Sequence, residues 1–182
     1  TGAVTHQYRF RTRAGSWIWI HDDLRVIERR DGGEQVIVGT WVDITELKRR
    51  EAQLALAIEV SGVGLFELDL DTMDVTTNAQ YATMLGYRPD EDHLSNEVWR
   101  DRLHPDDRAK ANGVFEDYIA GRIPEYRNEY RLRTARGDYA WILSVGRIIE
   151  RHPDGRPKRM IGTHTDITAV KRSLEQSRLR EE

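Results

Sequence analysis

The sequence contains no cysteine among its 182 residues. This absence excludes disulfide bonds, thiolate metal sites, cysteine nucleophiles and any photochemistry that forms a cysteinyl adduct. Disulfides are rare where thiols are kept reduced, so a chain without cysteine fits a cytoplasmic location. We therefore expect a cytoplasmic protein.

Long apolar runs are also missing. No stretch approaches the roughly 20 apolar residues that a membrane helix requires, and no secretory leader opens the sequence. The chain begins at Thr1 rather than at methionine, so we expect a piece of a longer polypeptide. We expect no membrane contact by this piece, which could still be the cytosolic part of a membrane-tethered receptor.

The sequence has no surplus of basic residues. Its formal net charge is −3 at pH 7, with 28 lysines and arginines against 31 aspartates and glutamates. Nucleic acid binding needs a concentrated basic face, so we expect no nucleic acid partner.

Histidines at metal-ligand spacing are missing as well. His104 stands next to Pro105 and two carboxylates, Asp106 and Asp107, but no second histidine lies at ligand spacing. We expect no metal site here. The pattern favours a turn in which Pro105 fixes the backbone and an aspartate caps the next helix.

What the sequence does contain is an internal repeat. Residues 8–29 and 130–151 are identical at eleven of 22 aligned positions. Residues 39–49 and 162–172 are identical at seven of 11. A repeat of this length indicates a duplicated domain rather than a solenoid of small units.

Each copy predicts three strands. Residues 8–11 read YRFR and residues 130–133 read YRLR, the period-two alternation of a strand with one buried face. Glycine and Asp-Gly sequences are typical of the turns between strands. These turns are predicted at Gly15 and Gly137, and at the Asp-Gly pairs 31–32 and 154–155.

A helix is predicted after the Asp-Ile-Thr sequence that closes each copy, over about residues 46–60 and 169–181. Thr45 and Thr168 are suited to cap these helices, because a threonine hydroxyl can accept a hydrogen bond from a free backbone amide.

Only the second copy has an opening half. Residues 63–70 alternate like a half-buried strand, and Asn78 can cap a short helix. Trp99 lies in a further short helix, and a longer amphipathic helix follows Asp107 and ends at Gly121.

The order and spacing of these segments resemble the PAS family, in the variant whose C-terminal half is called the PAC motif. The resemblance implies an α+β fold with a five-stranded antiparallel sheet and short helices on one face. It also implies sensing, dimerisation or relay within a larger signalling protein. The matching segments are Gly64–Leu70, the N…LGY helix from Asn78 to Tyr87, the HPDD turn at 104–107, and the GT…DIT endings at 39–45 and 162–168.

The resemblance divides the chain into a partial domain and a complete one. The first copy lacks the opening strands and the helices, and three strands cannot bury an apolar face alone. Our hypothesis is that these strands pack on a neighbour. We expect the C-terminal half of a PAS domain at 1–45, a linker helix at 46–60, a complete PAS domain at 61–168 and a signalling helix at 169–182.

Two sets of residues are candidates for function. The first is the strand-to-helix junction, through which the resemblance implies that strand shifts reach the outgoing helix. The second is an aromatic pocket that could hold a non-covalent flavin or a small aromatic molecule, although core packing explains the same residues. The junction residues are Asp43, Thr45, Asp166 and Thr168, and the pocket residues are Trp99, Tyr118, Tyr130 and Trp141.

Haem is disfavoured as a cofactor. Haem-binding members of the family usually supply a histidine from the long helix, and residues 107–121 contain none. His164 aligns with Trp41 of the first copy, so we expect it to fill a packing position.

The sequence thus favours a non-catalytic sensory and dimerisation module, with a histidine kinase or diguanylate cyclase effector elsewhere in the polypeptide. We expect a homodimer. The alternative is a sensor that binds flavin or another small molecule. No nucleophile–base pair or phosphate-binding loop supports an autonomous enzyme.

Overall fold

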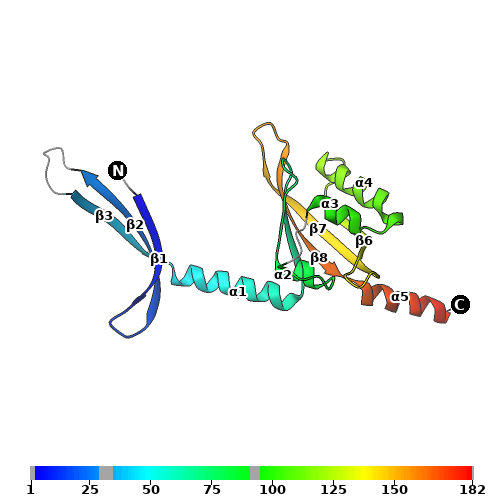
Figure 1. Cartoon of the computed structure of the whole chain (residues 1–182), viewed down its shortest axis with the longest axis horizontal. Coiled ribbons are helices and arrows are strands. Elements are labelled where there is room, and N and C mark those ends of the chain that lie inside the picture. The colour runs from blue at the N-terminus through cyan, green and yellow to red at the C-terminus, as the bar shows by residue number, and fades with distance from the viewer. Residues whose placement is uncertain (1–2, 29–34, 91–94, 182) are drawn as a thin grey trace. The chain divides into compact units, whose positions relative to one another are not determined.

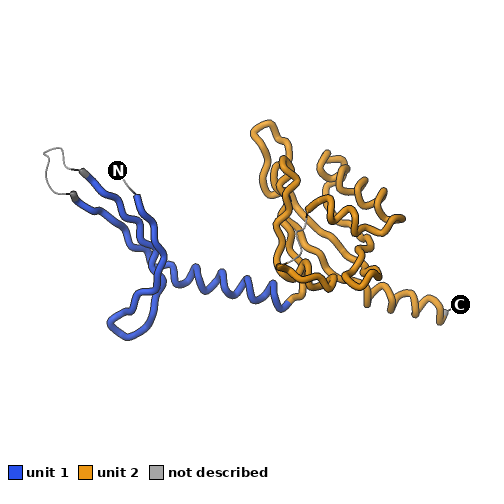
Figure 2. Tube along the Cα trace, viewed as in Figure 1, with its two compact units in different colours: residues 1–60 blue, residues 61–182 orange. Residues whose placement is uncertain are grey.

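The computed structural model describes residues 3–28, 35–90 and 95–181 (Figure 1). It divides into two compact units, Thr1–Val60 and Ser61–Glu182, which we call unit 1 and unit 2 (Figure 2). The turn predicted at residues 31–32 lies outside the described residues.

Unit 1 is a meander of three antiparallel strands followed by a helix. The three strands predicted for the first repeat are present, and their order in the sheet is β1-β2-β3. The elements are β1 (Ala3–Arg11), β2 (Trp17–Glu28), β3 (Gln35–Asp43) and α1 (Thr45–Ser61).

Unit 2 contains the predicted five-stranded antiparallel sheet, with the strand order β5-β4-β8-β7-β6. The last strand returns to the centre of the sheet and pairs with the first strand of the unit. The opening half and the repeated half of the sequence are therefore joined in one sheet. The strands are β4 (Gly64–Asp69), β5 (Val75–Thr77), β6 (Tyr126–Arg133), β7 (Tyr139–Arg151) and β8 (Pro157–Asp166).

Short helices cover one face of this sheet, and one further helix leaves it after β8 (Figure 1). The face under the helices holds the core, in which Leu85 and Leu103 pack on Leu132 and Ile142. The helices are α2 (Ala79–Thr83), α3 (Asn96–Arg102), the 3-10 helix η1 (Pro105–Asp107), α4 (Arg108–Ile119) and α5 (Thr168–Glu181).

The cap predicted at Asn78 is confirmed. Its side-chain oxygen accepts a hydrogen bond from the Tyr81 amide at the start of α2. The same side chain also bonds to the backbone of Leu65 and Val63, which fixes α2 against β4.

The aspartate cap predicted for the HPDD turn is wrong. The His104 ring accepts the hydrogen bond from the Asp106 amide, and Asp107 makes no side-chain cap bond to α4. Asp107 instead binds the backbone amide and the guanidinium of Arg131 at 2.8–2.9 Å. Pairing with an arginine holds the carboxylate away from the helix start and ties the turn to β6.

The glycine turns of the second copy are confirmed. Gly137 and Gly155 have φ values of 91° and 86°, in the left-handed region that favours glycine. In unit 1, Gly15 occupies the equivalent turn with φ 88°.

Candidate functional site

The junction between β7 and α5 is a compact set of backbone and side-chain hydrogen bonds. The Ile167 amide donates to the Trp141 carbonyl at 2.8 Å, and the Trp141 amide donates to the Thr168 hydroxyl at 2.9 Å. The Thr168 amide in turn donates to an Asp166 carboxylate oxygen at 2.8 Å. The first residues of α5 are therefore bonded directly to the middle strand of the repeat.

Unit 1 repeats this geometry between β2 and α1. Thr45 accepts from the Trp19 amide at 2.8 Å, and its own amide donates to Asp43 at 2.9 Å. The Ile44 amide donates to the Trp19 carbonyl at 2.9 Å. Hydrogen bonds from the Thr45 hydroxyl and amide lower the pKa of Asp43.

The predicted role of the two threonine hydroxyls is therefore wrong. In both units the hydroxyl accepts from a strand amide rather than from a helix amide, and the aspartate two residues earlier accepts from the threonine amide. The threonine is thus a bond between sheet and helix, which couples the two elements more directly than a helix cap would.

A second contact ties α5 to the opposite face of the sheet. The Trp141 ring lies 5.1 Å from the Lys171 ammonium and 5.2 Å from the Arg131 guanidinium. Lys171 also pairs with Glu129, and this pair lowers the pKa of the carboxyl group. In unit 1, Lys48 of α1 lies 6.0 Å from the equivalent Trp19 ring.

Unit 2 also contains a partly open cavity of about 50 Å³ between the sheet and its helices. Its wall is largely aromatic, with a few buried polar groups. It is lined by Phe66, Leu68, Val75, Tyr81, Asn96, Trp99, Phe115, Tyr126, Tyr130, Ser144 and His164.

The four residues predicted to form a pocket separate in the structure. Trp99 and Tyr130 line the cavity. The Tyr118 hydroxyl accepts a hydrogen bond from the Ile148 amide, and its ring packs on Tyr126 beside the cavity. Trp141 lies on the opposite face of the sheet, with the cations of the junction.

A hydrogen-bonded chain crosses the cavity wall. The indole of Trp99 donates to the Tyr130 hydroxyl at 3.2 Å, and that hydroxyl is 2.9 Å from Nε2 of His164. Burial lowers the pKa of His164 to about 3, so the imidazole is neutral at physiological pH. Burial also raises the pKa of Tyr130 well above its ordinary value.

His164 fills a packing position, as its alignment with Trp41 predicted. Its ring stacks on Tyr81 with centroids 4.5 Å apart and meets Phe66 edge-on at 5.2 Å. Sequence reasoning missed Ser144, which lies opposite His164 on β7. The signal was available, because Ser144 is in phase with the inward-facing Ala140 and Ile142.

The cavity is smaller than the sites that usually hold a ligand of flavin size. Sites for cofactors and drug-sized ligands usually enclose roughly 300–1,000 Å³, several times the about 50 Å³ found here.

The described residues form neither a metal-binding cluster nor a helix suited to a membrane. Residues 3–28, 35–90 and 95–181 contain no cluster of three or more histidine, aspartate or glutamate side chains placed to hold a metal ion. In the same part of the chain, no helix is long and apolar enough to cross a membrane.

The chain is similar to proteins of known family. A family model described as the PAS fold matches residues 1–41 and 74–164. The two segments correspond to most of the three-stranded sheet of unit 1 and to most of unit 2. The match therefore includes both copies of the repeat.

Two curated relatives carry signalling names. The probable diguanylate cyclase DgcE of Escherichia coli is 25% identical over 172 residues, which cover 90% of this chain and 15% of the relative. The methyl sulfide methyltransferase-associated sensor of Methanosarcina acetivorans is 25% identical over 185 residues, covering 95% and 18%. The chain thus spans about a fifth or less of these relatives.

Solved structures have the same fold. A sensory box histidine kinase/response regulator from Burkholderia thailandensis is 29% identical with a TM-score of 0.61, covering 71% of this chain and 95% of that chain. The N-terminal domain of a diguanylate cyclase with PAS/PAC sensor from Marinobacter aquaeolei is 24% identical with a TM-score of 0.53, covering 60% and 98%.

Proposed function

The chain belongs to the PAS fold family, and from this premise we propose that it is a non-catalytic sensory module that passes structural changes to its outgoing helix. The PAS fold is a sensory fold, and the relatives with enzymatic names are much longer than this chain. Their names support an effector of the diguanylate cyclase or histidine kinase type in the same polypeptide.

One observation carries the proposal: the two strand-to-helix junctions have the same pattern of hydrogen bonds. Thr45 and Thr168 each accept the amide of a strand tryptophan, at 2.8 and 2.9 Å. A shift of β7 cannot leave Thr168 in place without breaking a partly buried hydrogen bond. Transmission is then a population shift between arrangements of sheet and helix.

A thermodynamic cycle tests the relay. Ile142→Val perturbs a fully buried side chain of β7, and Thr168→Val removes the acceptor of the Trp141 amide while keeping the side-chain shape. We expect Ile142→Val to change amide hydrogen exchange in α5 of the wild type, but to leave it nearly unchanged in the Thr168→Val background.

The matched control for this cycle is Thr163→Val, which removes a threonine hydroxyl on β8 at a position opposite Val145, outside the hydrogen bonds of the junction. In that background, Ile142→Val should change exchange in α5 as it does in the wild type. Equal responses of α5 with and without the Thr168 hydroxyl would refute the relay.

The module also forms a homodimer in this proposal. Apolar side chains are exposed along the outgoing helix, with Val170 and Leu174 both 58% exposed and Leu179 69% exposed. Exposed apolar side chains on one element are typical of an association surface. Leu174→Glu should shift the protein toward monomer in sedimentation equilibrium, and a wild-type monomer at high concentration would contradict the dimer.

A second candidate function is the sensing of a small molecule, and the cavity in unit 2 favours it. The cavity has an aromatic wall and two fully or almost fully buried polar side chains, Ser144 and His164. Its volume of about 50 Å³ favours a ligand smaller than the flavin of our alternative expectation.

A further inference from the structure

In addition to the cavity under its helices, unit 2 has a surface groove of about 330 Å³ beside β7. The pairing of β6 with β7 ends at Tyr126 and Gly146, whereas β7 continues to Arg151. The groove lies where β7 extends past the start of β6. Sites for small molecules usually enclose about 300–1,000 Å³, so the groove is large enough for one.

Two arginines line this groove in diagonal positions. Arg127 on β6 lies opposite Val145 on β7, and Arg147 is two residues further along β7. Both arginines are exposed and alternate with buried neighbours, so they share the face of the sheet opposite the helices. Side chains in diagonal positions begin about 7–8 Å apart, a separation that two arginine side chains can close around one anion.

Neither arginine forms an ion pair with any residue that the structure describes. The acidic residues of the two strands have other partners. Glu129 of β6 pairs with Lys171. Glu150 of β7 pairs with Lys158 and Arg159. The positive charges of the two arginines are therefore available to an anion.

The equivalent place in unit 1 holds a carboxylate. By the alignment of the repeat, Asp23 of β2 is equivalent to Val145, and Arg25 is equivalent to Arg147. Unit 1 thus has a carboxylate beside its arginine, whereas unit 2 has an apolar side chain beside two arginines. The repeat therefore indicates which chemical group is missing from the wall of the groove.

The surroundings of that carboxylate show that this place stabilises a negative charge. The hydrogen bond that Thr5 donates to Asp23, together with the charges of His21 and Arg25, lowers the pKa of the Asp23 carboxyl group. A lowered pKa means that the charged form is favoured. In unit 2, Arg127 replaces Thr5, so a carboxylate at this place meets two arginines instead of one.

The rest of the groove suits a small anion with an apolar body. The Tyr118 hydroxyl accepts a hydrogen bond from the Ile148 amide at 3.1 Å, so its own proton is available to an acceptor. Val145 and Pro124 contribute apolar surface. Among the described residues of the wall, Glu125 alone is acidic, and it offsets one of the two arginine charges. The groove therefore favours a monovalent anion over a divalent one.

We propose that this groove binds small organic monocarboxylates, with the carboxylate between Arg127 and Arg147 and the apolar body against Val145. Guanidinium groups match a carboxylate through paired N–H donors. The groove lies outside the hydrogen bonds of the strand-to-helix junction. The proposal therefore goes beyond the sensory relay and does not depend on it.

Benzoate and benzamide test the proposal directly, since they have nearly the same shape and differ in charge. Each probe is titrated into the full chain, and the backbone amide resonances of Val145 and Arg147 are followed by NMR. We expect benzoate to shift them saturably in the millimolar range, because exposed ion pairs are individually weak, and benzamide to leave them unchanged. Equal shifts with both probes, or no shift with either, would overturn the proposal.

A pair of variants at one position isolates the role of charge. Val145→Asp gives unit 2 the carboxylate that unit 1 already has, and it should weaken benzoate binding about ten-fold or more. Val145→Asn introduces a side chain of nearly the same shape without the charge, and it should bind benzoate as the wild type does. Equal affinities of the two variants would mean that the arginine charges do not hold benzoate, and the site would be wrong.

Arginine substitutions then assign the contact. Arg147→Gln should weaken benzoate binding about ten-fold, the loss of a charge-assisted hydrogen bond. Arg25→Gln is the matched change in unit 1 and should leave the affinity unchanged, because Asp23 already lies beside that arginine. An equal loss in both variants would indicate adventitious binding to exposed arginines and would overturn the site. The comparison of benzoate with benzamide in the wild type decides the matter whether or not the variants fold.

Discussion

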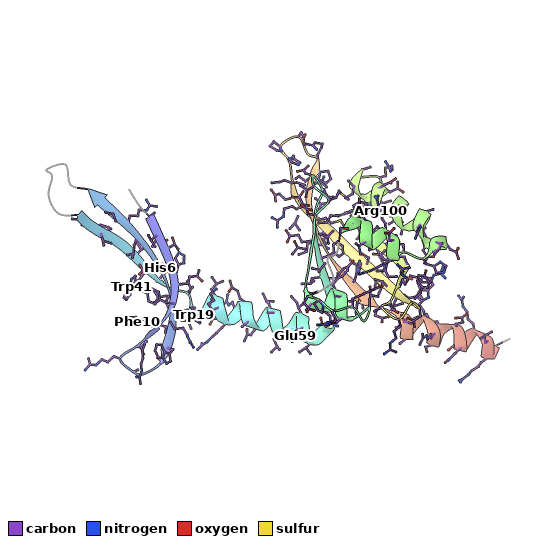
Figure 3. The ribbon with its side chains drawn as sticks, in the orientation of Figure 1. His6, Phe10, Trp19, Trp41, Glu59 and Arg100 are labelled. Atoms are coloured by element: carbon purple, nitrogen blue, oxygen red, sulfur yellow. The ribbon has the colours of Figure 1, made fainter. Side chains whose placement is uncertain are left out.

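Units 1 and 2 carry the same three strands in opposite environments. Trp41 is 57% exposed in unit 1, whereas His164 at the equivalent position of unit 2 is 2% exposed. Phe10 is 42% exposed, against 1% for its equivalent Leu132. Figure 3 labels Phe10 and Trp41 on the sheet of unit 1. The repeat therefore determines which side chains share a face, and the opening half of unit 2 determines whether that face is buried.

The central positions of unit 1 show how much burial a three-stranded sheet achieves without a covering layer. Ile20 and Asp22 on β2 are 5% and 6% exposed, because the flanking strands cover them. Tyr8 donates to Asp22 at 3.1 Å, and its ring meets Trp41 edge-on at 6.4 Å. These contacts bury the centre of the middle strand and leave its ends and the edge strands exposed, as expected for a small sheet without a second layer.

The largest effect is expected from truncating the equivalent core positions. Leu132→Ala removes a side chain that packs with Leu85 and Leu103, and large-to-small changes at such sites cost about 2–5 kcal/mol. Phe10→Ala should cost about 1 kcal/mol or less, because much of the ring is already in water. Urea unfolding of each variant gives the free energy of unfolding, and similar losses would mean that the unit 1 face is covered in solution.

The elements of both units could be predicted from the sequence because each rests on a local pattern. The alternation of apolar and polar residues predicted the strands, the turn glycines predicted the hairpins, and Asn78 predicted the start of α2. The partners of single side chains could not be predicted in this way. Asp107 stands where a helix cap belongs, yet its partner Arg131 is 24 residues away on β6.

The residues predicted to line the pocket also show what residue type alone cannot predict. Trp141 was chosen for its aromatic ring, although it alternates with the inward-facing Ala140 and Ile142 and so belongs to the other face. Phase on the strand was a better guide than residue type, since it would have selected Ser144. The size of the cavity depends on how the helices pack and has no signal in the sequence.

An intermediate effect is expected from the ion pair between Asp107 and Arg131. Among its described residues, unit 1 has no counterpart of the 3-10 helix η1 that carries Asp107. Arg131 binds Asp107 through its backbone and guanidinium, whereas the equivalent Arg9 lies exposed on β1. Asp107→Asn should destabilise unit 2 by about 1–3 kcal/mol, since it weakens several charge-assisted bonds at once. Arg9→Gln is the matched change in unit 1 and should cost less than about 0.5 kcal/mol.

The effect of Asp107 also has a defined pH dependence. The hydrogen bond and charge of Arg131 lower the pKa of Asp107, so the folded value lies below the unfolded value of about 4. The contribution is fully present above the unfolded pKa and is lost as the pH falls through the folded pKa. The difference in unfolding free energy between wild type and Asp107→Asn should therefore shrink below about pH 4. A difference that stays constant down to pH 2 would contradict the assignment.

The smallest effect is expected from the ion pair between Lys171 and Glu129, which joins α5 to the sheet face opposite the covering helices and has no equivalent among the described contacts of unit 1. Lys171 touches both Trp141 and Glu129, whereas Lys48 of unit 1 lies over Trp19 and pairs with Glu51 of its own helix. The Lys171 and Glu129 side chains are each 35% exposed, so solvent screens the pair and its coupling should be about 0.5–1 kcal/mol.

A double-mutant cycle of Glu129→Gln and Lys171→Gln measures that coupling, and raising the salt concentration should reduce it. Lys171→Gln should also speed amide exchange in the first turn of α5 more than Lys48→Gln does in α1, because only Lys171 ties its helix to a charged residue on the sheet. Equal exchange in the two helices would show that the threonine bonds alone hold both junctions. The outer-face contact of unit 2 would then add nothing to the coupling between sheet and helix.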